Sequence, residues 1–215
     1  MSTIHVDKRL HIALLSFLLM LTALTTYRPI YPNEQFLQHI GTALLMGLII
    51  ADMRQHKLGI TALTGLTLFT CLHIIGARWI YSYVPYASWA EHLHLPFELT
   101  TERNHYDRLV HFSFGLLLFP FFYDRIRALT HQRLWAISGA WLCIQTGSLV
   151  YELFEWGLTL VLSPNEAEGY NGQQGDIWDA QKDMALALVG STLTAIVYSL
   201  CRRKRQRNLR RTGHN

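Results

Sequence analysis

Six long apolar runs constrain the fold of this chain more than any other feature of its sequence. The hydrocarbon core of a bilayer is ~30 Å thick and needs about 20 residues of helix to cross it. The runs are continuous rather than alternating in polarity, which argues against barrel strands, and they lack the polar face of a helix in a soluble bundle. The sequence therefore predicts an all-α, polytopic membrane bundle of about six transmembrane helices, at approximately residues 10–26, 36–53, 58–83, 107–123, 134–162 and 180–201.

Composition supports a membrane protein with a single domain. Only 16% of the residues are charged, whereas soluble domains carry roughly 25%. The three cysteines, Cys71, Cys143 and Cys201, are scattered within apolar runs, so we expect neither a disulfide framework nor a zinc knuckle. No long linker separates a second domain. We expect one transmembrane domain over residues 1–201, followed by a basic cytoplasmic tail over residues 202–215.

The distribution of charge predicts the orientation in the membrane. If the N-terminus is cytoplasmic, fourteen of the 19 basic residues fall on the inner side and only three of the 15 acidic residues do. This asymmetry follows the positive-inside rule and places both termini in the cytoplasm. Residues 25–29, after the first run, offer no small-x-small cleavage site. We therefore expect a retained first helix rather than a signal peptide.

The basic tail has two conceivable partners, anionic lipid and nucleic acid. Five of the six residues from Arg202 to Arg207 are basic, and they follow the last apolar run directly. Basic residues in that position are typical of an anchor against anionic lipid headgroups. We expect membrane lipids as partners and no nucleic acid, and the sequence leaves the oligomeric state open.

The ionisable residues inside or beside the apolar runs are the candidate functional residues. Asp107 and His111 are four residues apart, which places them on one face of a helix. The predicted topology puts this pair near the outer ends of the helices, together with other acidic residues of the fifth and sixth runs. Those residues are Glu152, Glu155, Asp179 and Asp183. Asp176 is expected to cap the last helix.

Three interpretations of this cluster remain open. An unpaired charge at membrane depth costs ~2.5–3.5 kcal/mol, so these groups should meet inside the bundle. One possibility is a network of salt bridges with Arg78, Arg103 and Arg108. Another is a polar pocket that faces the non-cytoplasmic side, and a proton or ion pathway is the third.

The pocket interpretation assigns a role to each residue. Carboxylates with one histidine suit magnesium, manganese, calcium or zinc, and the proposed ligands of a divalent metal ion are Asp107, His111, Glu155 and Asp183. An enzyme of this kind would be a metal-assisted hydrolase or transferase acting on a lipid headgroup. Its ligands or bases would be Asp107, Glu152, Glu155, Asp179 and Asp183, with His111 as ligand or proton shuttle and with Arg103, Arg108 and Arg78 binding an anion. The alternative is a non-enzymatic transporter or structural membrane protein. We regard His11 and His39 as incidental.

Three segments carry a resemblance to known families. Residues 103–112, 152–156 and 172–184 resemble the YjdF-type family of bacterial inner-membrane proteins, across nearly the whole chain. The resemblance implies a small multi-pass protein of the inner membrane and leaves its activity open. A weaker likeness to the VanZ-like family implies a cell-envelope role near lipids or glycopeptide precursors. In that likeness Asp107 and His111 pair with a later glutamate and an acidic last helix, but residues 152–156 read Glu-Leu-Phe-Glu-Trp where that family has Glu-x-x-Gln.

Overall fold

The computed structural model describes residues 6–94, 103–163, 167 and 170–211, and the regular elements in these residues are all helices. This confirms the predicted all-α class. The described residues form seven helices: α1 (Lys8–Thr26), α2 (Pro32–Gln55), α3 (Ile60–Arg78), α4 (Tyr86–His92), α5 (Tyr106–Thr130), α6 (Arg133–Val161) and α8 (Asp179–Arg211).

Five of these helices are long and apolar enough to cross a membrane. They are α1, α2, α3, α5 and the first 23 residues of α8, from Asp179 to Cys201. The remaining long helix, α6, has 29 residues, which corresponds to about 44 Å. Polar side chains such as Gln145, Glu152 and Glu155 interrupt its apolar run, and α6 is not one of the five.

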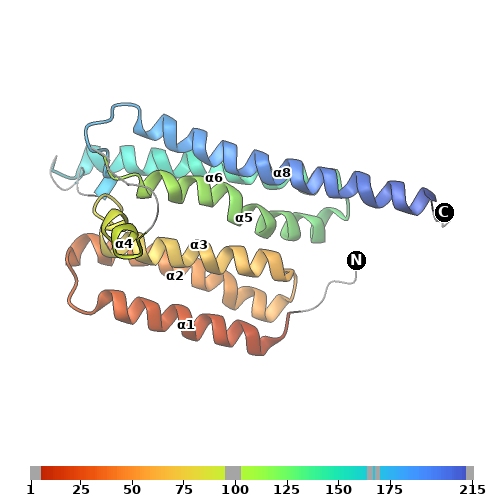
Figure 1. Cartoon of the computed structure of the whole chain (residues 1–215), viewed down its shortest axis with the longest axis horizontal. Helices are drawn as coiled ribbons and strands as arrows, with labels where there is room; N and C mark the ends of the chain where they lie inside the picture. The colour runs from red at the N-terminus through yellow and green to blue at the C-terminus, as the bar shows by residue number, and fades with distance from the viewer. Residues whose placement is uncertain (1–5, 95–102, 164–166, 168–169, 212–215) are drawn as a thin grey trace.

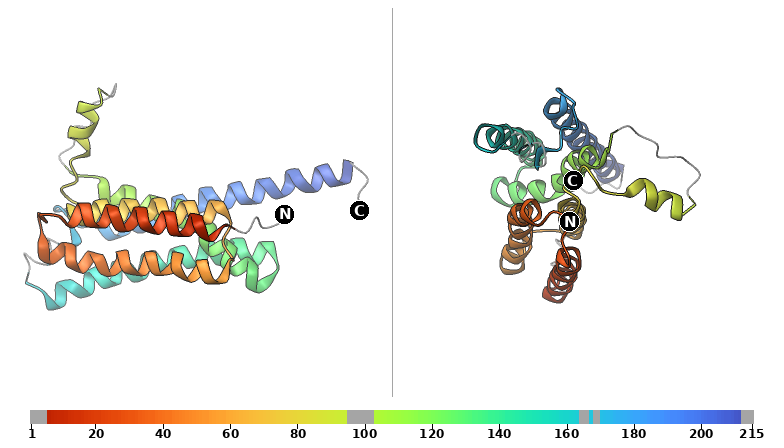
Figure 2. Two further views of the ribbon diagram at one scale, coloured as in Figure 1. Left: turned by 90° about the horizontal axis from the view of Figure 1, so that it is seen from below. Right: turned by 90° about the vertical axis from the view of Figure 1, so that its left-hand side faces the viewer.

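The six long helices run side by side as two groups of three (Figure 1). In one group α1 and α2 pack against α3, and in the other α6 and α8 pack against α5. Contacts between α3 and α5 join the two groups, and Figure 2 shows both groups in a view along the bundle. We call the end where α3 ends and α5 and α8 begin the site end. The opposite end, where α1 begins and α8 ends, is called the terminal end.

The outer surface of the bundle is apolar, and polar side chains are buried within it. Large apolar side chains such as Phe36, Leu44 and Leu160 are exposed. Several ionisable side chains are instead fully or almost fully buried, among them His11, Asp52, His111, Glu152, Asp179 and Asp183. Lipid chains do not compete for hydrogen bonds, so a membrane bundle stabilises polar groups only in its interior. The distribution therefore agrees with a protein embedded in a bilayer.

Glycines allow the central helices to approach closely. A β-carbon added at Gly115 of α5 would collide with the carbonyl oxygen of Ala187 in α8, and one at Gly190 of α8 would collide with that of Phe112. Gly65 of α3 meets the backbone of Leu117 in the same way. Small residues at helix crossings are typical of membrane bundles, where van der Waals packing drives association. These contacts fix α5 against both of its neighbours.

The structure corrects several predicted boundaries. The third helix ends at Arg78 rather than at residue 83, because Ile80 and Tyr81 adopt left-handed backbone conformations with φ of 42° and 59°. Tyr81 turns inward onto Gly76, and the short helix α4, which the sequence analysis did not predict, projects from the bundle (Figure 2). The helix predicted over 107–123 extends to Thr130, past Pro120. The last helix continues to Arg211, so the first ten residues of the predicted tail are helical.

The glycine contacts give a direct test of this packing. Replacing Gly115 or Gly190 by alanine should lower the free energy of unfolding by about 1–3 kcal/mol, because the added methyl group overpacks the crossing. Thermal melts in neutral detergent would measure the loss. Gly47→Ala and Gly157→Ala are matched controls, since nothing lies within 4 Å of a β-carbon at either position. Equal melting temperatures for all four variants would contradict the close crossing.

Candidate functional site

Three helices bring the candidate residues together at the site end. Asp107 and His111 lie in the first turns of α5, Glu152 lies in the last third of α6, and Asp179 and Asp183 open α8. The arrangement follows from the up-and-down course of the chain, since α5 and α8 begin where α6 ends (Figure 1). The predicted residues of these three helices therefore lie at one end of the bundle.

Asp107, His111 and Asp183 form the centre of the site. One ligand atom from each of these residues lies within 4.8 Å of the corresponding atoms of the other two. The Nε2 atom of His111 lies 3.6 Å from Oδ1 of Asp107 and 3.6 Å from Oε1 of Glu152. We call these four residues, Asp107, His111, Glu152 and Asp183, the acid–histidine cluster.

The cluster is buried and lacks hydrogen-bond donors. Asp183 is 2% exposed and Glu152 is 6% exposed. Oδ1 of Asp183 and Oε1 of Glu152 have no hydrogen-bond partner among the described residues. A buried carboxylate oxygen without a donor is costly unless a proton or a cation compensates it. The cluster thus has unused capacity to hold a positive charge.

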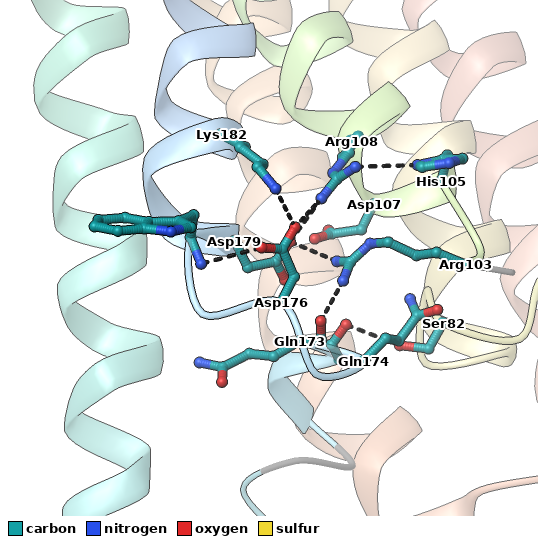
Figure 3. A network of polar contacts seen from close by, with 12 residues as sticks. Ser82, Arg103, His105, Asp107, Arg108, Gln173, Gln174, Asp176, Asp179 and Lys182 are labelled. Carbon is teal, nitrogen blue, oxygen red and sulfur yellow. Dashed lines mark hydrogen bonds and ion pairs between the residues drawn. The ribbon is translucent and has the colours of Figure 1, made fainter.

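A second layer of charged groups lies beside Asp107 at the site end (Figure 3). Nη2 of Arg103 lies 2.5 Å from Oδ1 of Asp179, and Nη2 of Arg108 lies 3.6 Å from the same oxygen. Oδ2 of Asp176 forms ion pairs with Nη2 of Arg108 and with Nζ of Lys182, and the second contact is 2.6 Å long. We call these five residues, Arg103, Arg108, Asp176, Asp179 and Lys182, the ion-pair layer. Here the predicted salt bridges do form.

The loop before α8 is held against the segment before α5. Oε1 of Gln174 accepts a hydrogen bond from the N–H of Asn104 at 2.9 Å, and Nε2 of Gln174 donates to the carbonyl of Asn104 at 3.1 Å. Arg103 also donates to the carbonyl of Gln173. These contacts place Asp176 beside the cluster. Oδ1 of Asp176 accepts the N–H of Trp178. Because α8 begins at Asp179, Asp176 forms a turn before the helix rather than the predicted N-cap.

Hydrogen bonds keep the carboxylate of Asp176 charged down to low pH. The hydrogen bond from Lys182 and that from the N–H of Trp178 lower the pKa of Asp176 to about 2. The stabilisation from Asp176 is therefore complete above its ordinary pKa of 3.8 and is lost as the pH falls through about 2. Burial, together with Arg108 and Arg103, lowers the pKa of His105 below its ordinary value. His105 consequently stays neutral beside the two guanidinium groups at pH 7.

Two of the predicted residues, Arg78 and Glu155, belong to neither the acid–histidine cluster nor the ion-pair layer. Arg78 donates to the carbonyl oxygens of Thr25 and Tyr27, at the end of α1. Glu155 is close to the cluster, but its carboxylate hydrogen-bonds Tyr151 on its own helix. Of the two glutamates predicted as ligands or bases, Glu152 is the one beside His111.

Two buried polar pairs were not predicted from the sequence. His11 in α1 and Asp52 in α2 form a contact of 3.0 Å at the terminal end, with side chains 0% and 1% exposed. In a helical hairpin the start of the first apolar run lies beside the end of the second. This geometry predicts a contact between His11 and Asp52 from the sequence alone. Nδ1 of His73 contacts the hydroxyl of Tyr81 at 2.5 Å, and its Nε2 contacts the carbonyl of Gln38. His39, also regarded as incidental, contacts Thr26.

The two layers predict opposite effects of neutralising an aspartate. Asp179→Asn removes the partner of Arg103 and should lower the free energy of unfolding by about 3 kcal/mol. Asp183→Asn removes a charge that no lysine or arginine pairs among the described residues, so it should leave stability unchanged or raise it. Melts of both variants in detergent would compare them. A large loss of stability in Asp183→Asn would contradict this distinction.

Comparison with known proteins identifies the family. The chain matches a family model described as predicted membrane protein (DUF2238) over residues 10–204. It is 30% identical over 174 residues to the inner membrane protein YjdF of Escherichia coli, which covers 79% of this chain and 78% of that protein. No solved structure matches the chain. The predicted YjdF-type resemblance and the multi-pass inner-membrane location are therefore confirmed. The chain belongs to the DUF2238 family of predicted membrane proteins.

Proposed function

We propose that the acid–histidine cluster binds a divalent metal ion at the non-cytoplasmic end of a six-helix membrane protein. The observation that carries this proposal is the convergence of Asp107, His111 and Asp183 around carboxylate oxygens that lack donors. An acidic cluster alone is common, but buried unpartnered oxygens directed at one histidine are not.

The spacing of the ligand atoms supports binding of one ion. Ligands on opposite sides of one magnesium or calcium ion are about 4–5 Å apart, since each bond is about 2.0–2.6 Å long. The atoms of Asp107, His111 and Asp183 lie within 4.8 Å of one another. Glu152 is not part of this group of three, but its Oε1 lies 3.6 Å from Nε2 of His111. Two carboxylates and one imidazole nitrogen suit magnesium, manganese, calcium or zinc.

The pairing of charges favours a metal over a purely structural network. The ion pairs among the described residues join arginine and lysine to Asp176 and Asp179 and leave Asp107, Glu152 and Asp183 to His111 or to no partner. Three carboxylates around a single histidine have an excess of negative charge. A divalent cation would balance that excess, and the salt-bridge interpretation offers no group that does so.

The orientation rests on charge and on the course of α6. Fourteen of the 19 basic residues lie on the side that carries both termini in the six-helix topology, which supports a cytoplasmic terminal end. Helix α6 runs alongside α5 and α8 (Figure 1), and its polar residues Gln145 and Glu152 face partners in those helices. This supports α6 as the sixth span. The basic residues 202–211 would then face anionic lipid headgroups of the inner leaflet.

The chemistry that fits this site is hydrolysis or group transfer at a lipid headgroup. A bound metal ion would supply Lewis acidity there. Among the residues of this chain, Glu152 is placed to accept a proton, and Arg103 and Arg108 are placed to hold an anion beside the cluster (Figure 3). A non-enzymatic role, in transport or in structure, is the alternative that the following tests address.

Metal binding predicts a stabilisation that depends on the cluster. Magnesium, manganese, calcium or zinc should raise the melting temperature of chelator-stripped protein at pH 7, since an ion at 100 times its Kd contributes about 2.7 kcal/mol. The shift should disappear in Asp183→Asn and in His111→Ala. Glu91→Gln is the matched control, because Glu91 is an exposed residue of α4 outside the cluster. If none of the four ions shifts the parent protein, the metal proposal is wrong and the structural alternative replaces it.

The proposed orientation has its own test. A reporter fused after Asn215 should report the cytoplasm, and the same reporter inserted within residues 165–175 should report the opposite compartment, because five of the six proposed spans separate the loop from the N-terminus. Alkaline phosphatase and green fluorescent protein fusions measure the two sides. Reporters on the same side would overturn the orientation and the non-cytoplasmic location of the site.

A further inference from the structure

The ion-pair layer has the geometry of a phosphate site that the protein itself occupies. One oxygen of Asp176 receives two cations from two helices, Arg108 of α5 and Lys182 of α8. Arg103 approaches from the segment before α5 and contacts the neighbouring Asp179 (Figure 3). Phosphate oxygens are bound by arginine and lysine in this convergent manner.

The guanidinium groups in this layer still have donors to offer. The Nε atoms of Arg103 and Arg108 are buried and have no hydrogen-bond partner among the described residues. A carboxylate has only two oxygens, and Oδ1 of Asp176 already accepts a hydrogen bond from the N–H of Trp178. A phosphate monoester presents three terminal oxygens. It would therefore use donor groups that Asp176 leaves without partners.

The charges match a phosphate once Asp176 is removed. Arg103, Arg108 and Lys182 carry three positive charges, and the carboxylate of Asp179, which lies beside Arg103 and Arg108, contributes one negative charge. The layer without Asp176 has a net charge of about +2, and a phosphate monoester carries about −1.5 to −2 at pH 7. The carboxylate of Asp176 compensates only part of this charge.

The segment that carries Asp176 lies before the first residue of α8 and exposes its apolar side chains. Gln174 and Gly175 next to Asp176 have left-handed φ values of 52° and 77°, and Ile177 and Trp178 are 83% and 59% exposed. Hydrogen bonds from the N–H of Asp176 to Gln173 and from the N–H of Asp179 to Asp176 hold the backbone, so a competing ligand has to displace only the side chain of Asp176 from its ion pairs. The segment is fixed on one side by the Gln174–Asn104 pair and on the other by α8.

We propose that Asp176 is an internal substitute for a phosphate monoester, and that such a ligand displaces its carboxylate from Arg108 and Lys182 and also binds Arg103. The ligand is either a lipid headgroup or a free phosphate compound, since both present the same group. The role of phosphate binding rests on the proposed function, because the phosphate would lie beside Asp107 of the acid–histidine cluster, which is the proposed metal site (Figure 3). Its binding step, however, uses protein cations alone.

Binding measurements on full-length protein would test the displacement. The protein is purified in neutral detergent with a chelator present, so that the result is independent of the metal proposal. Asp176→Asn should bind inorganic phosphate and glycerol 3-phosphate at least about tenfold more tightly than the parent, because no internal competitor remains. Arg108→Gln should bind them at least about tenfold more weakly. Glu91→Gln removes the same charge as Asp176→Asn but lies outside the layer, and it should match the parent.

Nanodiscs distinguish the two sources of phosphate. Tighter binding of Asp176→Asn to nanodiscs with phosphatidic acid than to those with phosphatidylcholine alone, with weak binding of soluble phosphate, identifies a lipid headgroup. The reverse pattern identifies a free phosphate compound. If Asp176→Asn binds neither source more tightly than the parent, the proposal is overturned.

A second measurement keeps the test independent of the stability of Asp176→Asn. A fluorophore on Ile177→Cys, in protein whose three native cysteines are replaced by alanine, reports the segment directly. In otherwise unchanged protein, saturating phosphate should alter its emission, and Arg108→Gln should abolish that response. An emission that phosphate leaves unchanged, in protein that binds phosphate, would show that Asp176 is not displaced.

Discussion

The close crossing of α5 with α8 is the contact on which the rest of the site depends. Gly115 and Gly190 bring the two backbones together, and Asp107 and Asp183 lie on the site-end side of this crossing. Larger residues there would separate α5 from α8, and the carboxylates would no longer share one histidine. In a bilayer the hydrophobic effect does not hold helices together, so this packing carries the geometry of the charged groups.

The site end separates charges that balance one another from charges that do not. In the ion-pair layer each carboxylate contacts two cations, since Asp176 contacts Arg108 and Lys182 and Asp179 contacts Arg103 and Arg108. Below it, Asp107, Glu152 and Asp183 face only His111, or no partner. Charges that served structure alone would be expected to pair throughout, since each unpaired group in the membrane is costly. This excess of negative charge lies at the site end, and it supports the proposed metal site.

Much of this could be predicted from the sequence, and the failures have physical causes. Apolar runs gave the long helices, and topology gave the common depth of Asp107, His111 and Asp183. Helical spacing could not decide whether Glu152 or Glu155 faces His111, because that depends on the rotation of α6 against α5. The bend at Ile80 and Tyr81 was hidden because apolar residues continue through it. The contact between His11 and Asp52 was not predicted because the two residues are far apart in sequence and meet only when α1 and α2 fold into a hairpin.

The His11–Asp52 pair bears on the order in which the protein is assembled. His11 and Asp52 belong to the first two helices, and Asp52 also accepts the N–H groups of Lys57 and Leu58 in the loop between α2 and α3. The first half of the chain thus satisfies its most buried charges with its own residues while the ribosome is still making the second half. The acid–histidine cluster differs, because Asp183 arrives only with the last helix. Asp107, His111 and Glu152 therefore enter the bilayer before their set is complete, and any cell that makes this protein must insert α8 before the site exists.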